Sequence, residues 1–225
     1  MPLLLAPPAP VEPDLIVVGG IPGAGKSTVI ARTVGLPGVE TLDPDQVRSW
    51  LRHRLPDRIH YRSYRPVVHV VQTLRVLARL WRGPVPGQRL VMHDPATRPR
   101  RRSLLARVAR LRGWTPAMVY VDIDLSSARR GQVERGRVVK PSSFDGHWSR
   151  WQQLRPQLVA DHRARSFDGF SSVELVDRER AAAALFARLG TVASAGQQPS
   201  RPAVSAAAAH TPARSDEPAQ GRSHA

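Results

Sequence analysis

Short, continuous runs of apolar residues alternate along the chain with longer segments in which apolar positions recur every three or four residues. Continuous runs are typical of strands buried on both faces of a parallel sheet, whereas the three-to-four spacing predicts helices with a buried face. Strands and helices alternate five times, which predicts an α/β fold: a three-layer sandwich with about five parallel strands and helices on both faces. The predicted strands are Leu15–Gly20, Val39–Asp43, Arg89–Asp94, Ala117–Asp124 and Val173–Asp177.

The segments between these strands predict helices. The longest is predicted over Pro66–Arg82, with apolar residues at helical spacing and Arg75, Arg79 and Arg82 on another face. Pro156 is expected to kink or split the helix over 147–158, because proline lacks the amide that helical bonding needs. One further helix is predicted to begin near Lys26. The others are predicted over 44–55, 100–113, 126–134 and 178–190.

The segment after the first predicted strand, GIPGAGKS at Gly20–Ser27, satisfies the pattern G-x-x-x-x-G-K-S/T. Its glycines let successive N–H groups point inward as a nest for an anion, at the start of a helix. Lys26, one of only two lysines, is expected to reach the β- and γ-phosphates of ATP, and the Ser27 hydroxyl to ligate Mg²⁺. The absence of an N/TKxD motif favours ATP over GTP. A glycine-rich turn that ends in Lys-Ser by chance is the alternative. The predicted nucleotide-binding residues are Gly20, Ile21, Pro22, Gly23, Ala24, Gly25, Lys26, Ser27 and Thr28.

Two carboxylates follow the second predicted strand. Asp43 and Asp45 lie at its carboxyl end, beside the crevice where open α/β sheets bind ligands. A kinase needs a carboxylate there to accept the proton of the acceptor hydroxyl. Arg48 lies three residues after Asp45 and therefore shares its helical face. The alternative is that Asp43 or Asp45 caps the helix.

The quoted segments resemble the P-loop kinases: GGIPGAGKST, then D-x-x-R, then VMHDPATRPRRRSLLARVARLRGW, then a strand and an arginine-rich lid. They are most similar to the polynucleotide 5′-hydroxyl kinase and zeta-toxin-like branch, whose members are often called AAA-family ATPases. Over about 15–189, the resemblance implies Asp45 as general base and Arg48 as a ligand of the acceptor or of the transferring phosphoryl group. It implies Asp94 as the acidic residue that orients Arg48 or the hydrated Mg²⁺. The family usually has a D-x-T-N-like motif here, whereas this chain has HDPAT. The difference bears on which class of acceptor would be phosphorylated.

The same resemblance implies a mobile lid over about 126–145. Arginines in such a lid neutralise charge on the transferring phosphoryl group in a water-poor site. Arg135 best matches the family's lid arginine, and Arg137 and Arg130 are further candidates. The family often pairs arginines four apart, whereas Gly131 stands within this segment. For each arginine a solvated basic helix is the alternative.

The chain carries 34 Lys and Arg residues against 18 Asp and Glu, a formal net charge of +16. This excess makes nucleic acid a possible partner, although an almost pure arginine excess also fits codon bias. Arg62, Arg65 and His69 are candidates for contacts to an anionic acceptor, against a plain amphipathic helix. The leading hypothesis is a kinase that uses ATP and Mg²⁺ to phosphorylate a hydroxyl of a nucleic-acid 5′ end, a nucleotide sugar or a small molecule. The alternative is an ATP-binding regulatory module with a basic nucleic-acid-binding face.

The ends of the chain have a different composition from the middle. Residues 1–13 are rich in proline and predict a disordered leader, and residues 191–225 contain almost no large apolar side chains and predict a disordered tail. The kinase-like domain is therefore expected over 14–190. The sequence has no cysteine, no basic segment before its first apolar residues and no apolar window of membrane-spanning length. A cytoplasmic protein without a membrane partner is expected.

Overall fold

The computed structural model describes residues 14–134, 136, 139–160 and 167–190. The predicted leader, the predicted tail and part of the predicted lid lie outside these residues. Five strands form one parallel sheet, and each predicted strand is confirmed with its ends shifted by at most two residues. The strands are β1 (Leu15–Gly19), β2 (Val39–Leu42), β3 (Arg89–His93), β4 (Pro116–Asp122) and β5 (Ser172–Asp177).

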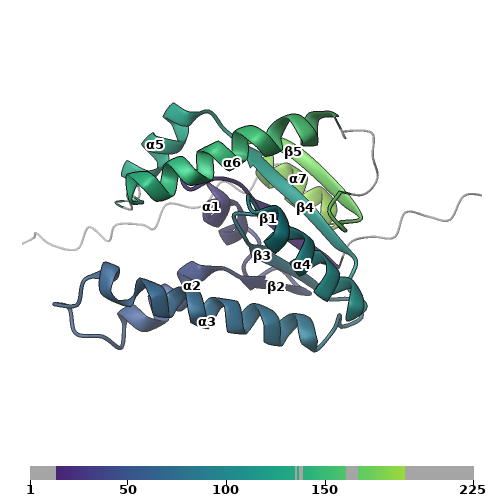
Figure 1. Cartoon of the computed structure of the whole chain (residues 1–225). Coiled ribbons are helices and arrows are strands. Elements are labelled where there is room, and N and C mark those ends of the chain that lie inside the picture. Colours follow the sequence, from purple (N-terminus) through teal and green to yellow (C-terminus); the bar gives the residue numbers. More distant parts are fainter. Residues whose placement is uncertain (1–13, 135, 137–138, 161–166, 191–225) are drawn as a thin grey trace, which may run out of the picture. The chain divides into compact units, whose positions relative to one another are not determined.

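Helices cover both faces of the sheet, as predicted. In Figure 1, α1 and α7 lie behind the sheet, and α3, α4 and α6 lie in front of it. The helices are α1 (Lys26–Ala31), α2 (Pro44–Arg52), α3 (Tyr61–Trp81), α4 (Pro99–Leu111), α5 (Leu125–Val133), α6 (Pro141–Ala160) and α7 (Ala181–Arg188).

The strand order β2-β3-β1-β4-β5 places β1 at the centre of the sheet. The chain leaves β1 toward β2 on one side and later crosses to β4 on the other, so the order reverses at β1. Ligands of open α/β sheets bind outside the carboxyl ends of the strands at such a reversal. Val18 pairs with His93, so β1 and β3 end side by side. The amide of Gly20 donates to the Pro95 carbonyl at 3.3 Å, which joins the two loops that leave these strands.

Two helices are longer than predicted, and each contains a proline. α3 begins at Tyr61 and includes Pro66, and α6 begins at Pro141 and continues through Pro156 to Ala160. Both internal prolines are exposed. The carbonyl that each proline leaves without a helical donor can therefore bond water, which makes an unbroken helix tolerable.

The orientation of α3 also differs from the prediction that Arg79 shares an outer face with Arg75 and Arg82. Arg79 is buried, and its Nε donates to Glu40 Oε2 at 2.5 Å while its Nη1 donates to the Gly83 carbonyl at 2.7 Å. Its guanidinium lies 4.8 Å from the ring centroid of Trp114. The ion pair and the aromatic contact thus hold Arg79 against the protein, toward β2. Many apolar residues of α3 are exposed instead.

Candidate active site

The loop between β1 and α1 curls around the side chain of Lys26. Gly23 and Gly25 have φ values of 91° and 97°, which only glycine adopts readily. The buried ammonium of Lys26 donates to the carbonyls of Gly20 and Ile21 at 2.8 and 2.9 Å. The loop is therefore folded as the G-x-x-x-x-G-K-S/T pattern predicts, with a cation inside the curl.

The donor set of this loop fits an anion. The backbone N–H groups of Gly23, Gly25 and Ser27 donate to no acceptor within the described part of the chain. Amides that lack a protein acceptor and surround an ammonium group are what a bound phosphate needs. Nowhere in the described ranges do three His, Asp or Glu side chains come together as metal ligands. Mg²⁺ commonly takes one or two protein ligands and completes its shell with phosphate oxygens and water, and its binding at Ser27 stays a prediction.

The start of the predicted lid packs directly on this loop. A Cβ atom on Gly23 would overlap the carbonyl oxygen of Ala128 in α5, and a Cβ atom on Gly131 would overlap the carbonyl oxygen of Gly23. Arg178, just after β5, donates through Nη2 to the Gly23 carbonyl at 2.6 Å. Position 131 therefore has no room for a side chain between α5 and the phosphate-binding loop.

Asp43 joins α2 to the phosphate-binding loop. Its Oδ1 accepts from the amide of Asp45 at 2.7 Å and caps α2, with Gln46 completing a capping box. Its Oδ2 lies 3.2 Å from Nδ1 of His93, and the same nitrogen lies 3.4 Å from Oγ of Ser27. Burial raises the pKa of Asp43, but the hydrogen bond and charge of His93 together with the Asp45 amide outweigh it, so the pKa is lowered. The cap is thus Asp43, and Asp45 is the second residue of the helix, in its first turn.

A row of polar side chains extends from Arg48 along α3. The guanidinium of Arg48 lies 4.6 Å from the ring centroid of Tyr61. Arg65 and His69 follow Tyr61 at four-residue intervals on α3, and Arg65 Nε lies 3.4 Å from His69 Nε2. Burial, then the charges of Arg65, Arg101 and His93, lowers the pKa of His69. This shift of the pKa favours the neutral form of His69, beside Arg65.

Asp94 is buried at the end of β3, but its partners differ from the expected ones. Its Oδ1 accepts from the Ala96 amide at 2.7 Å, and its Oδ2 accepts from Arg101 Nε at 2.9 Å. Arg48 lies on Tyr61 instead. The pairing of Asp94 with Arg48 is not made in this structure, and its contact with hydrated Mg²⁺ stays a prediction.

Two of the three candidate lid arginines, Arg135 and Arg137, lie outside the described residues. Arg130 is exposed and donates to the hydroxyls of Ser126 and Ser127 on its own helix at 3.1 and 2.7 Å. The resemblance therefore remains the basis for the role of Arg135.

Sequence reasoning missed three residues at this site: His93, Arg178 and His147. His147 Nδ1 lies 3.1 Å from the Thr97 hydroxyl, and burial, then the charges of Arg150, Lys26 and Arg98, lowers its pKa to about 4. His93 is the last residue of β3, and Arg178 directly follows β5. A position at the carboxyl end of a strand is the one signal in the sequence that could have found them.

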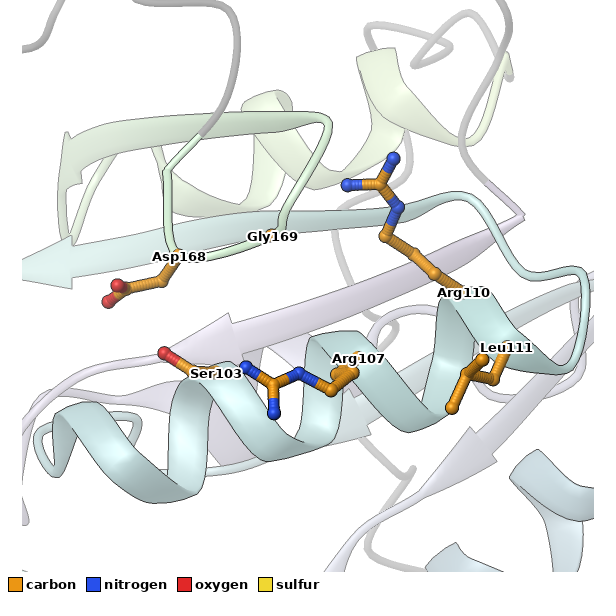
Figure 2. Close-up of a pocket in the computed structure, with 6 residues that line it drawn as sticks. All are labelled: Ser103, Arg107, Arg110, Leu111, Asp168 and Gly169. Carbon is orange, nitrogen blue, oxygen red and sulfur yellow. The ribbon is translucent and has the colours of Figure 1, made fainter.

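A hollow of about 440 Å³ lies away from this site, beside α4. Figure 2 shows Ser103, Arg107 and Arg110 on α4 and Asp168 on the facing turn. Asp168 is paired with the buried Arg102. The hollow lies near the amino ends of β4 and β5, the end of the sheet opposite the phosphate-binding loop, so it is not the nucleotide site.

The family model for the AAA domain matches residues 15–159, which contain the phosphate-binding loop, Asp45 and Asp94. The chain belongs to the AAA domain family. A search of curated proteins finds no match. No helix among the described residues of this AAA-domain chain has the length and apolar character needed to cross a membrane.

Several solved structures are similar to this AAA-domain chain. A chain from the PezAT chromosomal toxin–antitoxin system of Streptococcus pneumoniae is 16% identical, with a TM-score of 0.49 over 76% of this chain and 69% of its own. Kti12 of Chaetomium thermophilum, in complex with ADP-AlF3, is 14% identical, with a TM-score of 0.48 over 78% and 98%. A gluconokinase from Sinorhizobium meliloti is 20% identical, with a TM-score of 0.44 over 80% and 93%. The family assignment rests on the family model.

Proposed function

We propose that the chain is a phosphotransferase of the polynucleotide 5′-hydroxyl kinase and zeta-toxin-like branch, which transfers the γ-phosphoryl group of ATP to an acceptor hydroxyl. The observation that carries the proposal is the contact of Asp43 with His93 and Ser27. Through it, the helix that bears Asp45 and Arg48 is anchored to the loop that bears Lys26. A nucleotide-binding module without an acceptor has no use for this connection.

Each residue has a role in an in-line transfer. The loop amides and Lys26 hold the β- and γ-phosphates, and Asp45 accepts the proton of the attacking hydroxyl. Mg²⁺, held at Ser27, would neutralise charge on the phosphate oxygens. Arg48 and Arg135 stabilise the negative charge of the phosphoryl group as it moves.

The acceptor side favours a substrate with an anionic group next to its hydroxyl. Arg48 and Arg65 have no carboxylate partner within the described ranges, and Tyr61 lies between them on one face of the α2–α3 pair. Guanidinium groups without a carboxylate partner bind phosphates or carboxylates strongly. A nucleic-acid 5′ end, a nucleotide sugar and an anionic small molecule all meet this requirement.

One observation favours the second candidate, an ATP-binding module with a basic nucleic-acid-binding face. α3 and α4 together contain nine arginines and no acidic residue, and seven of these arginines are not buried. Such a surface attracts phosphate backbones without sequence specificity.

ADP release measured with and without acceptors separates the two candidates. We expect release to increase with one acceptor class among 5′-hydroxyl oligonucleotides, nucleotide sugars and small alcohols, with label transferred from γ-labelled ATP. Asp45→Asn should retain ATP binding and lose transfer, whereas Asp57→Asn, at an exposed ion pair with Arg52, should retain both. Transfer that survives in Asp45→Asn would exclude Asp45 as the base. Slow ADP release that no acceptor changes would favour the binding module.

A further inference from the structure

α3 is apolar on two opposite sides. Its inner side packs on the protein, with Tyr64, Val68 and Val76 buried. Its outer side carries five large apolar residues that are each 47% to 65% exposed and recur at intervals of 3, 4, 3 and 4: Val67, Val70, Leu74, Leu77 and Trp81. These five residues are called the α3 seam below. A second apolar side on a helix is expected to be covered, and a continuous exposed apolar row marks an interaction surface.

We propose that the α3 seam joins two copies of this chain as an antiparallel pair of α3 helices. Spacings of 3 and 4 are those of a coiled-coil seam, and the intervals of 4, 3 and 4 from Val70 to Trp81 read the same in the reverse direction. An antiparallel copy therefore places Leu74 opposite Leu77 and Val70 opposite Trp81, and the same two layers repeat across a two-fold axis. A two-fold interface requires such a self-complementary surface.

The residues beside the seam favour a second copy over an acidic partner. With Val67, Leu74 and Trp81 at position a and Val70 and Leu77 at position d, the flanking e and g positions hold no charged residue. An acidic helix would find no cation at these positions, and two copies of α3 bring no like charges together at them. The flanking residues are Tyr64, Pro66, Val71, Thr73, Ala78 and Leu80.

The exposed area of the seam agrees with the needs of a dimer. A standard interface buries about 800 Å² per partner, of which about 57% is non-polar. With their exposed fractions, the five side chains of the seam offer about 400 Å² of apolar surface. The seam alone thus supplies most of the non-polar area that a dimer of ordinary size requires.

Sedimentation velocity on the full chain tests the proposal. We expect a species of twice 24.8 kDa to replace the monomer as protein concentration rises from about 1 to about 100 µM. The dimer should strengthen with added salt, because salt screens the repulsion between two chains of charge +16. Leu74→Glu and Leu77→Glu should each weaken it at least a hundredfold. Val133→Glu, at a residue 68% exposed on α5, is the matched control and should leave it unchanged.

A cysteine crosslink gives a second readout that does not depend on a buried charge. The chain has no cysteine, so Leu74→Cys introduces a single thiol, and so does Val133→Cys. In the proposed register the two introduced thiols lie about one helical turn apart across the two-fold axis, so a short bismaleimide should link Leu74→Cys into covalent dimers and leave Val133→Cys monomeric. A wild-type chain that stays monomeric at about 100 µM would overturn the proposal, as would a dimer that persists in both glutamate variants. If the glutamate variants lose their circular dichroism, the crosslink alone decides.

Discussion

Replacing Gly131 by alanine tests whether α5 packs directly on the phosphate-binding loop. Two effects oppose each other at this position. Alanine is favoured over glycine inside a helix by about 1 kcal/mol. The new Cβ atom, however, would overlap the carbonyl oxygen of Gly23, and it would lie 2.9 Å from Nη2 of Arg178. Because the main obstacle is backbone, no change of rotamer removes the overlap.

The overlap should dominate. Overpacking typically costs about 1–3 kcal/mol, and a clash with backbone lies at the upper end. With the helix-propensity gain subtracted, Gly131→Ala should lower the free energy of unfolding by about 2 kcal/mol. The displaced Gly23 carbonyl belongs to the loop that holds the phosphates. ATP binding should therefore weaken by about tenfold or more, which corresponds to about 1.4 kcal/mol.

Urea unfolding and titration with a fluorescent ATP analogue measure the two effects. Gly146→Ala is the matched control, because Gly146 also lies inside a helix but its added Cβ atom would meet only the flexible end of Arg150, at 3.4 Å. That variant should gain about 1 kcal/mol of stability and bind the nucleotide as the wild type does. If Gly131→Ala behaved like Gly146→Ala in both assays, the direct packing of α5 on the loop would be refuted.

Two further variants test the contribution of titratable groups to stability. In the folded chain His147 has a pKa of about 4 instead of 6.5, so the unfolded state binds more protons between these values and stability falls as the pH decreases from 6.5 to 4. His147→Gln should reduce that loss by about 2 kcal/mol at pH 4.5 in urea titrations compared at pH 7 and 4.5, and equal losses in both proteins would contradict the assignment. Asp168→Asn leaves the buried Arg102 without its counter-charge and should cost about 2 kcal/mol, whereas Asp177→Asn, at an exposed pair with Arg180, should cost less than about 0.5 kcal/mol. Equal thermal stability of these two variants would show that the Arg102 pair contributes little.

The strands and the phosphate-binding loop could be predicted because their signals are local. β1, β3 and β4 each contain an uninterrupted run of at least three apolar residues, and the loop motif occupies eight consecutive residues. Helix ends were harder to predict, since Pro66 and Pro156 interrupt a helix only where the freed carbonyl cannot reach water. In both cases that carbonyl lies on an exposed face.

The rest of the candidate site depends on the order of the strands, which periodicity does not contain. Ser27, Asp43 and His93 meet because β3 lies between β1 and β2. The role of Gly131 could have been inferred, since a glycine inside a helix is unfavourable and usually has a packing or functional reason. The burial of Arg79 could not, because it depends on Glu40 and Trp114, which are distant in sequence.

Equilibrium titration of the full chain with ATP in the presence and absence of Mg²⁺ tests the central claim most directly. The account predicts saturable binding of one ATP per chain that Mg²⁺ strengthens and that Lys26→Ala abolishes or weakens by at least tenfold. Lys140→Ala, at the other lysine of the chain, should bind ATP as the wild type does. Absence of binding at millimolar ATP, or equal binding by wild type and Lys26→Ala, would contradict the claim that the loop from Gly20 to Ser27 holds a polyphosphate.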